Sequence, residues 1–318
     1  MNKPQNTLDE YLLRIGILNS FMPNEYLENN IYHYTSPEGL RSILFADSEK
    51  ITLWASRYDC MNDMSEGKIA LSVFLEVCNE LLENGEISLE LYNLFTKIRP
   101  ARTQLLVYGD GTSIQATRKE TDRFVCSFSK NKDSLTMWNY YSKGSKYEGY
   151  NISLFSRSVT DSFRSFFGKG VSIHVYPIIY AKTAQKKLII ELLKKLQEYY
   201  EKKYEPQIRY IISNQLTEWG LIFKSDFFQH EEEVRIIIDT PKKSIDNPSF
   251  VVNYKMNCGY IVPYIELKID KDSLMGVSIG PLQCTNEQKE LQKEILHEML
   301  ISNGYNALET YSKIPVRY

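Results

Sequence analysis

The chain has 318 residues, of which 43% are hydrophobic, and its formal net charge is −2. This content is enough to bury a large core. The near-neutral charge excludes a general electrostatic affinity for nucleic acid or for an anionic membrane, so neither is an expected partner, although a local basic groove stays open.

The cysteines and the N-terminus indicate the cellular setting. The five cysteines are widely spaced and form no C-x-x-C pair, which argues against a disulfide framework and against a zinc site. Residues 1–23 lack the basic start and apolar core of a signal peptide, and no apolar run approaches membrane-spanning length. We therefore expect a soluble, cytoplasmic protein. Without internal repeats or linkers, residues 1–318 are expected to form one α+β domain.

The first elements follow from capping signals and apolar spacing. Residues 7–19 predict an N-terminal helix that begins at Thr7 with a capping box. Residues 31–35 predict a strand, and Ser36 followed by Pro37 predicts the start of a helix that runs to residue 45. A strand follows over 50–56.

Helical insertions and further strands complete the expected order. Residues 65–99 predict a helical hairpin, and residues 182–219 predict a lysine-rich helical segment interrupted at Pro206, with a solvated face around an apolar stripe. A short helix is expected over 133–144 and a capped one over 285–304. Further strands are expected at 123–129, 147–155, 171–180, 230–239, 260–269, 274–280 and 307–316.

The sequence "IYHYTS" carries the first candidate residues. On a strand, His33 and Thr35 share one face, while Tyr32 and Tyr34 point to the other. A histidine and a hydroxyl would then be aimed together at a ligand. The alternative is a histidine that only braces the following helix.

A second candidate group lies in "WASRYDCMNDMSEG". Trp54 and Ser56 end a strand, and Asn62 and Asp63 fit a turn or N-cap, with Glu66 completing a capping box. That structural account is sufficient for the acids. A role in binding ribose hydroxyls or a basic substrate is the alternative.

A third group is the helix-spaced stripe of Met137, Trp138 and Tyr141, a pattern more typical of a core than of a cofactor site. Tyr141 would present its ring and hydroxyl at the edge of that stripe. Its position therefore makes it a candidate site residue.

The fourth group is "HEEEVRIII". On a strand, Glu231, Glu233 and Arg235 would share one face, and an apolar row would occupy the other. Neighbouring carboxylates raise each other's pKa, whereas the adjacent guanidinium favours their ionised forms. Such a row could stabilise positive charge, or it could be a surface row paired with lysines. No metalloprotease, Walker or Rossmann motif competes, and no metal is expected.

Together, "YHYTS", "LWAS", "ND-x-x-E", "MW-x-x-Y", "E-x-E-x-R" and "SKIPVRY" resemble, in order, a bacterial family catalogued as domain of unknown function 2971. The opening H-x-T-S also resembles, more distantly, the start of the ADP-ribosyltransferase-like fold. That resemblance implies a split β-sheet with an NAD cleft, in which a histidine, an aromatic residue and a late glutamate form the working set.

On this resemblance we expect NAD-dependent ADP-ribosyl transfer to an unknown macromolecule, or NAD hydrolysis, in a toxin or phage-defence effector. A non-catalytic sensor that binds a nucleotide or partner in the same cleft is the alternative. The resemblance assigns catalysis to Glu233, His33 and Tyr141. It also implies a stacking aromatic residue, for which Trp54, Tyr58 and Tyr141 are candidates. The expected binding residues are Tyr34, Thr35, Ser36, Trp54, Ser56, Asn62, Asp63, Glu66, Trp138, Glu231 and Arg235.

Overall fold

The computed structural model describes most of the chain, namely residues 21–60, 68–100, 103–107, 113–117, 121–141, 148–167, 171–241, 251–257, 259–282 and 284–315. The expected helix over 7–19 lies outside these residues. So do three of the expected binding residues, Asn62, Asp63 and Glu66.

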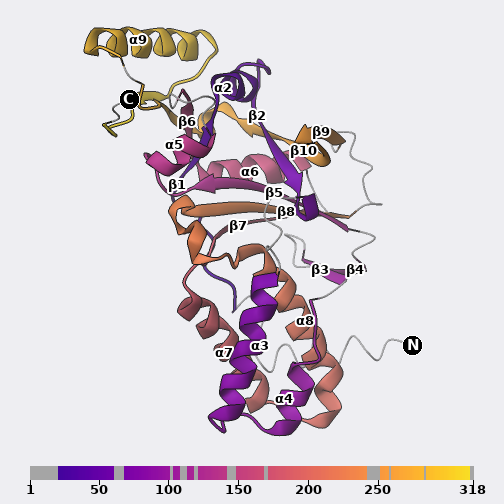
Figure 1. Ribbon diagram of the computed structural model, residues 1–318. Coiled ribbons are helices and arrows are strands. Elements are labelled where there is room, and N and C mark those ends of the chain that lie inside the picture. The colour runs from indigo at the N-terminus through magenta and orange to yellow at the C-terminus, as the bar shows by residue number, and fades with distance from the viewer. Residues whose placement is uncertain are drawn as a thin grey trace.

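A ten-stranded sheet forms the centre of the molecule (Figure 1), and its main path runs β12-β11-β6-β1-β5-β2-β10-β9. The pairings are antiparallel except for that of β11 with β12, and β7 and β8 extend the sheet from β5. The strands are β1 (Asn30–Thr35), β2 (Lys50–Arg57), β5 (Thr121–Ser129), β6 (Tyr150–Phe155), β7 (Ser172–Pro177), β8 (Glu233–Pro241), β9 (Val252–Asn257), β10 (Tyr260–Asp270), β11 (Leu274–Ile279) and β12 (Leu308–Tyr311). β3 (Thr103–Val107) and β4 (Ser113–Thr117) pair separately.

The sheet divides along β5. One edge of this strand pairs with β8 from residue 121 to residue 129. Its other edge pairs with β2 at Phe124 and Val125, and with β1 at Ser129. Among the described residues, the stretch 126–128 between these pairings has no partner in β1 or β2. The two strands therefore diverge and leave backbone groups of β5 available to side chains.

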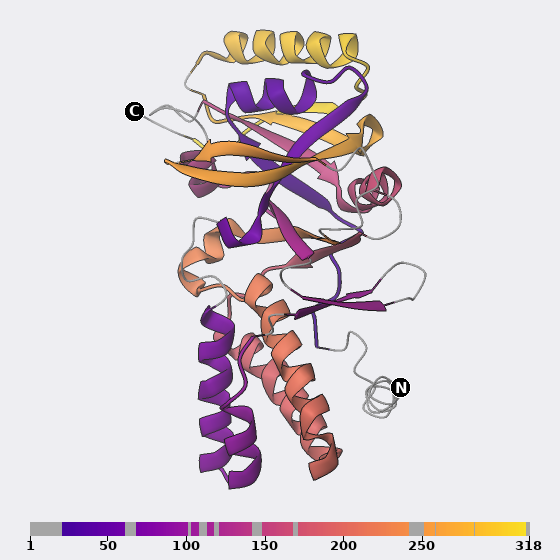
Figure 2. The ribbon, with the colours of Figure 1, turned by 90° about the vertical axis from the view of Figure 1, so that its right-hand side faces the viewer.

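Helices pack against both faces of the sheet. They are α2 (Pro37–Leu44), α3 (Lys68–Glu83), α4 (Leu89–Phe95), α5 (Leu135–Tyr141), α6 (Ser156–Phe167), α7 (Lys182–Glu198), α8 (Glu205–Ile222) and α9 (Asn286–Ser302). Short 3-10 turns occur at η1 (Tyr58–Cys60), η2 (Lys202–Tyr204), η3 (Asp226–Glu231) and η4 (Lys271–Ser273). α3, α4, α7 and α8 form a bundle below the sheet, and α9 lies at the opposite end (Figures 1 and 2).

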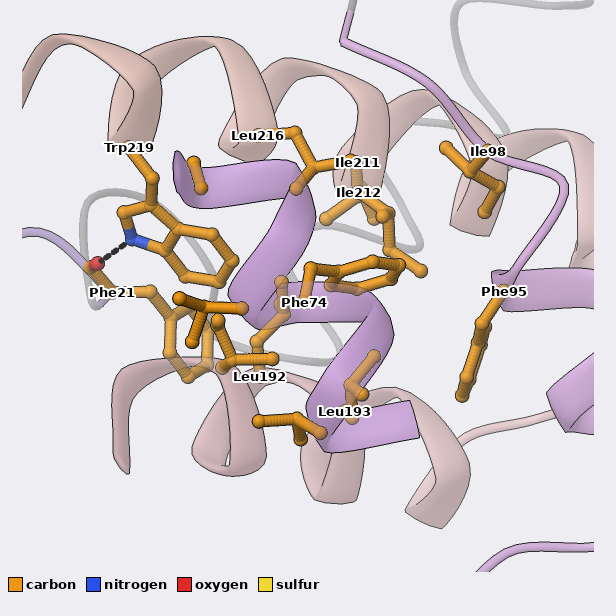
Figure 3. Packing of buried hydrophobic residues seen from close by; sticks show 14 of the residues in the cluster. Phe21, Phe74, Phe95, Ile98, Leu192, Leu193, Ile211, Ile212, Leu216 and Trp219 are labelled. Carbon is orange, nitrogen blue, oxygen red and sulfur yellow. Dashed lines mark hydrogen bonds between the residues drawn. The ribbon is translucent and has the colours of Figure 1, made fainter. Parts of the chain in front are cut away.

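The bundle has its own apolar core. Phe74 of α3, Leu192 of α7 and Trp219 of α8 are all fully buried there (Figure 3). The indole Nε1 of Trp219 donates a hydrogen bond to the carbonyl oxygen of Phe21 at 2.9 Å. Val125 of β5 belongs to the same cluster, so the bundle and the sheet pack against each other. The two helical insertions thus meet and cover one face of the sheet.

The lysines of α7 lie on a solvated face, as the sequence predicts. Lys186 pairs with Glu76 and Glu80 of α3 at 2.8 and 2.6 Å, and Lys194 pairs with Glu86 at 2.8 Å. These pairs join α7 to acidic residues of the neighbouring helical hairpin. Pro206 does not interrupt a continuous helix but lies in the first turn of α8, where its missing amide hydrogen is tolerated.

The second core lies on the other face of β8. Val234, Ile236 and Ile238 are fully buried in it, whereas Ile237 points toward the bundle. This alternation is the expected period of a strand with both faces covered. Because Glu233 shares the face of Ile237, its carboxylate is also directed toward the bundle side of the sheet.

The α+β class is confirmed, as are several element boundaries. Ser36 caps α2 by accepting a hydrogen bond from the amide of Gly39 at 3.1 Å, and Thr285 forms a capping box with Gln288 at α9. Four elements of the structure, α6, β3, β4 and β9, have no counterpart in the sequence-based prediction.

The prediction of a strand over 230–239 is wrong at its start. Residues 226–231 form a 3-10 turn, and Glu232 has a φ of 44° in the left-handed region, so β8 begins at Glu233. Glu231 therefore does not belong to the alternating row of Glu233 and Arg235. The direction of the Glu231 side chain is set by the 3-10 turn and not by the alternation of the strand.

Candidate functional site

A cavity of about 680 Å³ opens where β1 and β2 diverge along β5. Side chains from β1, β2, β5, β8, β9, α5 and η3 form its walls. The lining includes Tyr32, His33, Tyr34, Trp54, Ser56, Ser127, Tyr140, Tyr141, Lys224, Phe228, Glu231, Glu233, Arg235, Lys255 and Asn257.

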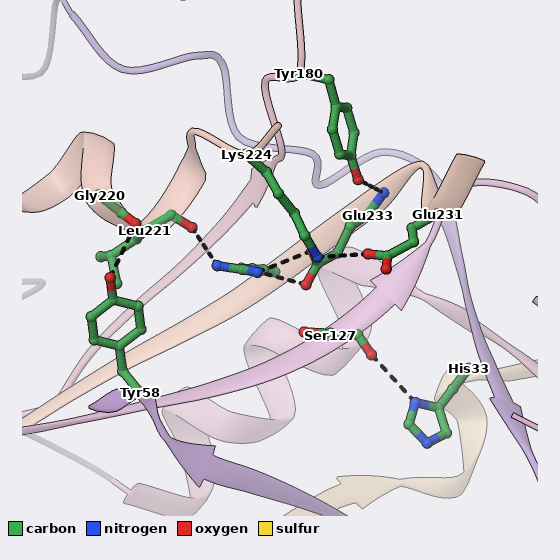
Figure 4. Close-up of polar contacts among 10 residues, drawn as sticks. His33, Tyr58, Ser127, Tyr180, Gly220, Leu221, Lys224, Glu231 and Glu233 are labelled. Atoms are coloured by element: carbon green, nitrogen blue, oxygen red, sulfur yellow. Dashed lines mark hydrogen bonds and ion pairs between the residues drawn. The ribbon is translucent and has the colours of Figure 1, made fainter. Parts of the chain in front are cut away.

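Glu233 is the most extensively bonded acid of this cavity (Figure 4). Arg235, two residues along the same face of β8, donates from Nε to Oε1 at 2.7 Å and from Nη2 to Oε2 at 3.1 Å. Lys224 donates to Oε2 at 3.2 Å. Glu233 is only 5% exposed, and its own amide donates to the hydroxyl of Tyr180. The carboxylate is thus fixed by charged donors from two elements.

These donors determine the charge state of Glu233. Burial by itself would raise the pKa of the carboxyl, but Arg235 and Lys224 outweigh burial and lower the pKa to about 2. The reciprocal effect holds at Lys224, where the two carboxylates outweigh burial and raise the pKa of the ammonium. At neutral pH, Glu233 is therefore ionised and lies between the positive charges of Arg235 and Lys224.

Glu231 is held less tightly than Glu233. Its Oε2 accepts from Lys224 at 2.7 Å, and its side chain remains 15% exposed. Lys224 is the sole partner of this carboxylate in the described part of the chain. Glu231 therefore presents an oxygen to the cavity that carries no hydrogen bond from the described residues.

His33 enters the cavity from β1. Its Nδ1 lies 3.4 Å from the carbonyl oxygen of Ser127, in the stretch of β5 that pairs with neither β1 nor β2 in the described structure, and its ring contacts Phe128 edge-on at 5.6 Å. A carbonyl can only accept, so Nδ1 carries the proton and Nε2 is an acceptor. Burial lowers the pKa of His33, and nearby Lys255 lowers it further. The imidazole is neutral at pH 7.

Ser127 links the histidine to the carboxylate. Its carbonyl faces His33, and its side chain lies near enough to Glu233 to help lower the pKa of that acid. In the β5–β8 ladder, Ser127 lies directly opposite Arg235. One serine on the shared strand therefore contacts both halves of the predicted site.

Aromatic rings form the remaining walls. Trp54 is 45% exposed and lies tilted on Tyr264, with ring centroids 4.4 Å apart. Tyr141, at the end of α5, is 48% exposed, and local burial together with the two carboxylates raises the pKa of its hydroxyl. Exposed ring faces of this kind can stack on a heterocycle. Trp54 and Tyr141 are the predicted residues available for that purpose, and Tyr140, which also lines the cavity, is 64% exposed.

Comparison with known proteins gives one family match. Residues 137–236 match the model of a family described as protein of unknown function, DUF2971. The predicted resemblance to that family is confirmed over this segment. It runs from α5 to β8 and contains Tyr141, Glu231 and Glu233. No curated protein and no solved structure matches the chain.

The structure brings most of the predicted site residues to this cavity. The DUF2971 segment supplies Tyr141, Glu231, Glu233 and Arg235, and the preceding strands supply His33, Tyr34, Trp54 and Ser56. Tyr34 also donates from its hydroxyl to the carbonyl of Asn131 at 2.8 Å, which fixes the start of α5. The expected convergence of His33, Glu233 and aromatic rings is observed.

Four of the predicted residues that the structure describes do not line the cavity. One is Tyr58, which donates from its hydroxyl to the carbonyl of Gly220 at 3.1 Å, and the other three are Ser36, Thr35 and Trp138. Ser36 caps α2, and Thr35 packs against Gly39, where an added Cβ would lie 1.9 Å from its Oγ1. Trp138 is 1% exposed and donates from Nε1 to Asp133 at 2.8 Å. The side chains of all four have structural partners that account for them.

The sequence-based prediction missed Lys224, Ser127 and Lys255. Lys224 follows the end of α8, a position at which a lysine is ordinarily explained by the helix dipole. Ser127 is one small polar residue within a buried strand. Neither carries a local signal, because each acquires its role only from the strands that fold beside it.

Within the described ranges, no cluster of His, Cys, Asp and Glu could hold a metal ion. The described cysteines, Cys60, Cys78, Cys126 and Cys284, are free thiols. No helix among the described residues combines the length and apolar character needed to cross a membrane.

Proposed function

We propose that the cavity binds NAD and that the protein cleaves its nicotinamide glycosidic bond, with transfer of ADP-ribose to water or to a macromolecular acceptor. The observation that carries the proposal is the convergence of His33, Glu231, Glu233 and exposed aromatic rings on one cavity. These groups match the chemical needs of the reaction.

Cleavage places positive charge on the ribose. As the bond between C1′ and the pyridine nitrogen breaks, its electron pair moves to the nitrogen and neutral nicotinamide leaves. Water or another nucleophile then bonds to C1′ and releases a proton. A carboxylate beside the ribose stabilises the oxocarbenium-like transition state more strongly than it stabilises ground-state NAD.

The neutral His33 suits a binding role at the ribose. Its Nδ1–H faces the carbonyl of Ser127, so Nε2 can accept a hydrogen bond from a ribose hydroxyl. The exposed ring of Tyr141 would stack on nicotinamide. A half-exposed ring above the carboxylates would also exclude water from one side of the sugar.

The two glutamates suit different parts of this task. The oxygens of Glu233 already accept three hydrogen bonds from Arg235 and Lys224, and a carboxylate has about four acceptor positions in all. Glu231 retains an oxygen without a partner among the described residues. We propose that Glu233 supplies the fixed negative charge of the site. Glu231 is the other candidate for the carboxylate that hydrogen-bonds to the ribose.

The divergence of β1 and β2 along β5 also supports the proposal. NAD binds in a cleft of a split sheet in the ADP-ribosyltransferase-like fold, to which the opening H-x-T-S is similar. Here the cavity opens at the division of the sheet, with His33 on one strand and Glu233 on another. An NAD-consuming toxin or phage-defence effector is the biological role that fits such an activity.

The saturated carboxylate of Glu233 favours a second candidate, a sensor that binds a nucleotide without turnover. An acid whose oxygens are occupied by an arginine and a lysine is poorly available to a substrate. The sensor hypothesis predicts that NAD raises the melting temperature of the protein without being consumed.

The test is to incubate purified protein with NAD and to follow free nicotinamide by chromatography. Wild-type protein should release nicotinamide, and Glu231→Gln and Glu233→Gln should release much less. Glu266→Gln is the matched control, because Glu266 lies on β10 outside the cavity lining. Stabilisation by NAD without release would favour the sensor, and equal release by all variants would remove both acids from the mechanism.

A further inference from the structure

Lys255 lines the same cavity as the carboxylates of Glu231 and Glu233. It belongs to β9, an edge strand that pairs with β10, where it faces Val262. Its neighbours Tyr254 and Met256 are 68% and 71% exposed on the outer face, whereas Lys255 and Asn257 line the cavity. The alternation of the strand therefore directs a cation and an amide inward.

The charge of Lys255 has no counterion among the described residues. The other cations of the lining, Lys224 and Arg235, both pair with Glu233. The ammonium of Lys255 instead lies 5.7 Å from the ring centroid of Trp54 and 5.8 Å from that of Tyr264. Burial lowers its pKa, as expected for an ammonium without a carboxylate partner. An anionic ligand would supply the missing charge.

We propose that Lys255 and Trp54 form a nucleotide subsite. The ammonium of Lys255 binds a phosphate group of the nucleotide, and the exposed indole face of Trp54 stacks on its base. Lysine serves as a point charge for phosphate, and indole offers the largest stacking surface of any side chain. The half-exposed face of Trp54 borders the same cavity as the ammonium. This inference rests on the proposed function and names the part of the site that selects phosphorylated ligands.

Calorimetric titration with ADP, adenosine and inorganic pyrophosphate tests the subsite. Wild-type protein should bind ADP more tightly than adenosine, and added salt should reduce that difference. Lys255→Met should weaken ADP binding about tenfold or more, which corresponds to the loss of one charge-assisted hydrogen bond, and should leave adenosine binding unchanged. Lys255→Arg should restore most of the affinity.

Lys268→Met is the matched control. Lys268 is a lysine of the neighbouring β10 that pairs with Asp47 at 2.9 Å and does not line the cavity. This variant should bind ADP as the wild type does, and melting temperatures should show that each variant is folded. Equal ADP affinity in Lys255→Met and wild type, or no ADP binding by wild type, would overturn the subsite.

Different results would refute the subsite and the proposed function. Nicotinamide release with the same KM in Lys255→Met and wild type would refute the subsite and leave the NAD chemistry standing. Lys255-dependent binding of ADP without nicotinamide release would establish the subsite and refute the catalytic proposal. Pyrophosphate tests whether the base contributes to binding. If Trp54 stacks on the base, pyrophosphate should compete only weakly with ADP.

Discussion

His33 and Glu233 share one neighbour, Ser127, whose carbonyl oxygen accepts from the imidazole and whose side chain helps to lower the pKa of the carboxyl group. The two groups lie on strands separated by β5 alone (Figure 4). Two hundred residues of sequence separate them, yet both face the cavity at the division of the sheet.

Glu233→Gln should destabilise the protein by about 3–5 kcal/mol, because it removes the common partner of two buried cations. Urea unfolding monitored by tryptophan fluorescence measures this change. Glu266→Gln should change the free energy of unfolding by less than about 1 kcal/mol, since Glu266 is partly exposed and its pair with Lys268 spans 3.5 Å. Similar values for the two variants would contradict the central role of Glu233.

The stability contributed by Glu233 should depend on pH. The folded-state pKa of about 2 lies below the ordinary value of 4.5, so the unfolded chain takes up the proton first as the pH falls. This contribution, on the order of 3 kcal/mol, is present above about pH 4.5 and is lost toward pH 2.

The pH prediction is measured by comparing wild type with Glu233→Gln. The difference in their free energies of unfolding should shrink between about pH 5 and about pH 3. The difference between the two proteins removes the contribution of other acids, such as Asp47, whose pKa is also lowered to about 2. A constant difference across this range would show that Glu233 is not selectively ionised in the folded state.

His33→Ala should weaken NAD binding about tenfold, because one hydrogen bond to the ribose is lost. His174→Ala is the matched control, since His174 lies on β7, bonds to Glu25 at 2.9 Å and does not line the cavity. Titration calorimetry at neutral pH measures both affinities. The hypothesis that His33 merely braces the helix predicts a lower melting temperature with unchanged NAD affinity.

Two serines separate a structural role from a ligand role. Ser36→Ala should cost about 1 kcal/mol of stability through loss of the N-cap of α2, with no change in NAD affinity. Ser56→Ala should leave stability within about 0.5 kcal/mol and weaken NAD binding, because Ser56 lines the cavity. Loss of affinity in Ser36→Ala alone would reverse this assignment.

The local parts of the fold could be predicted from the sequence. Ser36 and Pro37 signal the start of α2, and the alternation in "EVRIII" places Glu233 and Arg235 on one face. Such signals depend on residues within a few positions of one another. They can therefore be recognised without knowledge of the tertiary structure.

The remaining parts depend on long-range packing. The left-handed Glu232 ends the 3-10 turn without a glycine to signal it, and thus the strand was predicted to begin too early. Lys224 and Ser127 join the site only because α8 ends beside β8 and β5 lies between β1 and β8. A single sequence carries no record of these pairings.

A crystal structure with carba-NAD, an NAD analogue that resists cleavage, would show directly whether the cavity binds NAD. We expect carba-NAD to bind in the cavity with its nicotinamide ribose within hydrogen-bonding distance of His33 and of Glu231 or Glu233. An aromatic ring of the cavity should stack on one of its heterocycles. Carba-NAD bound away from the cavity, or a cavity that stays empty at a saturating concentration of the analogue, would contradict this expectation.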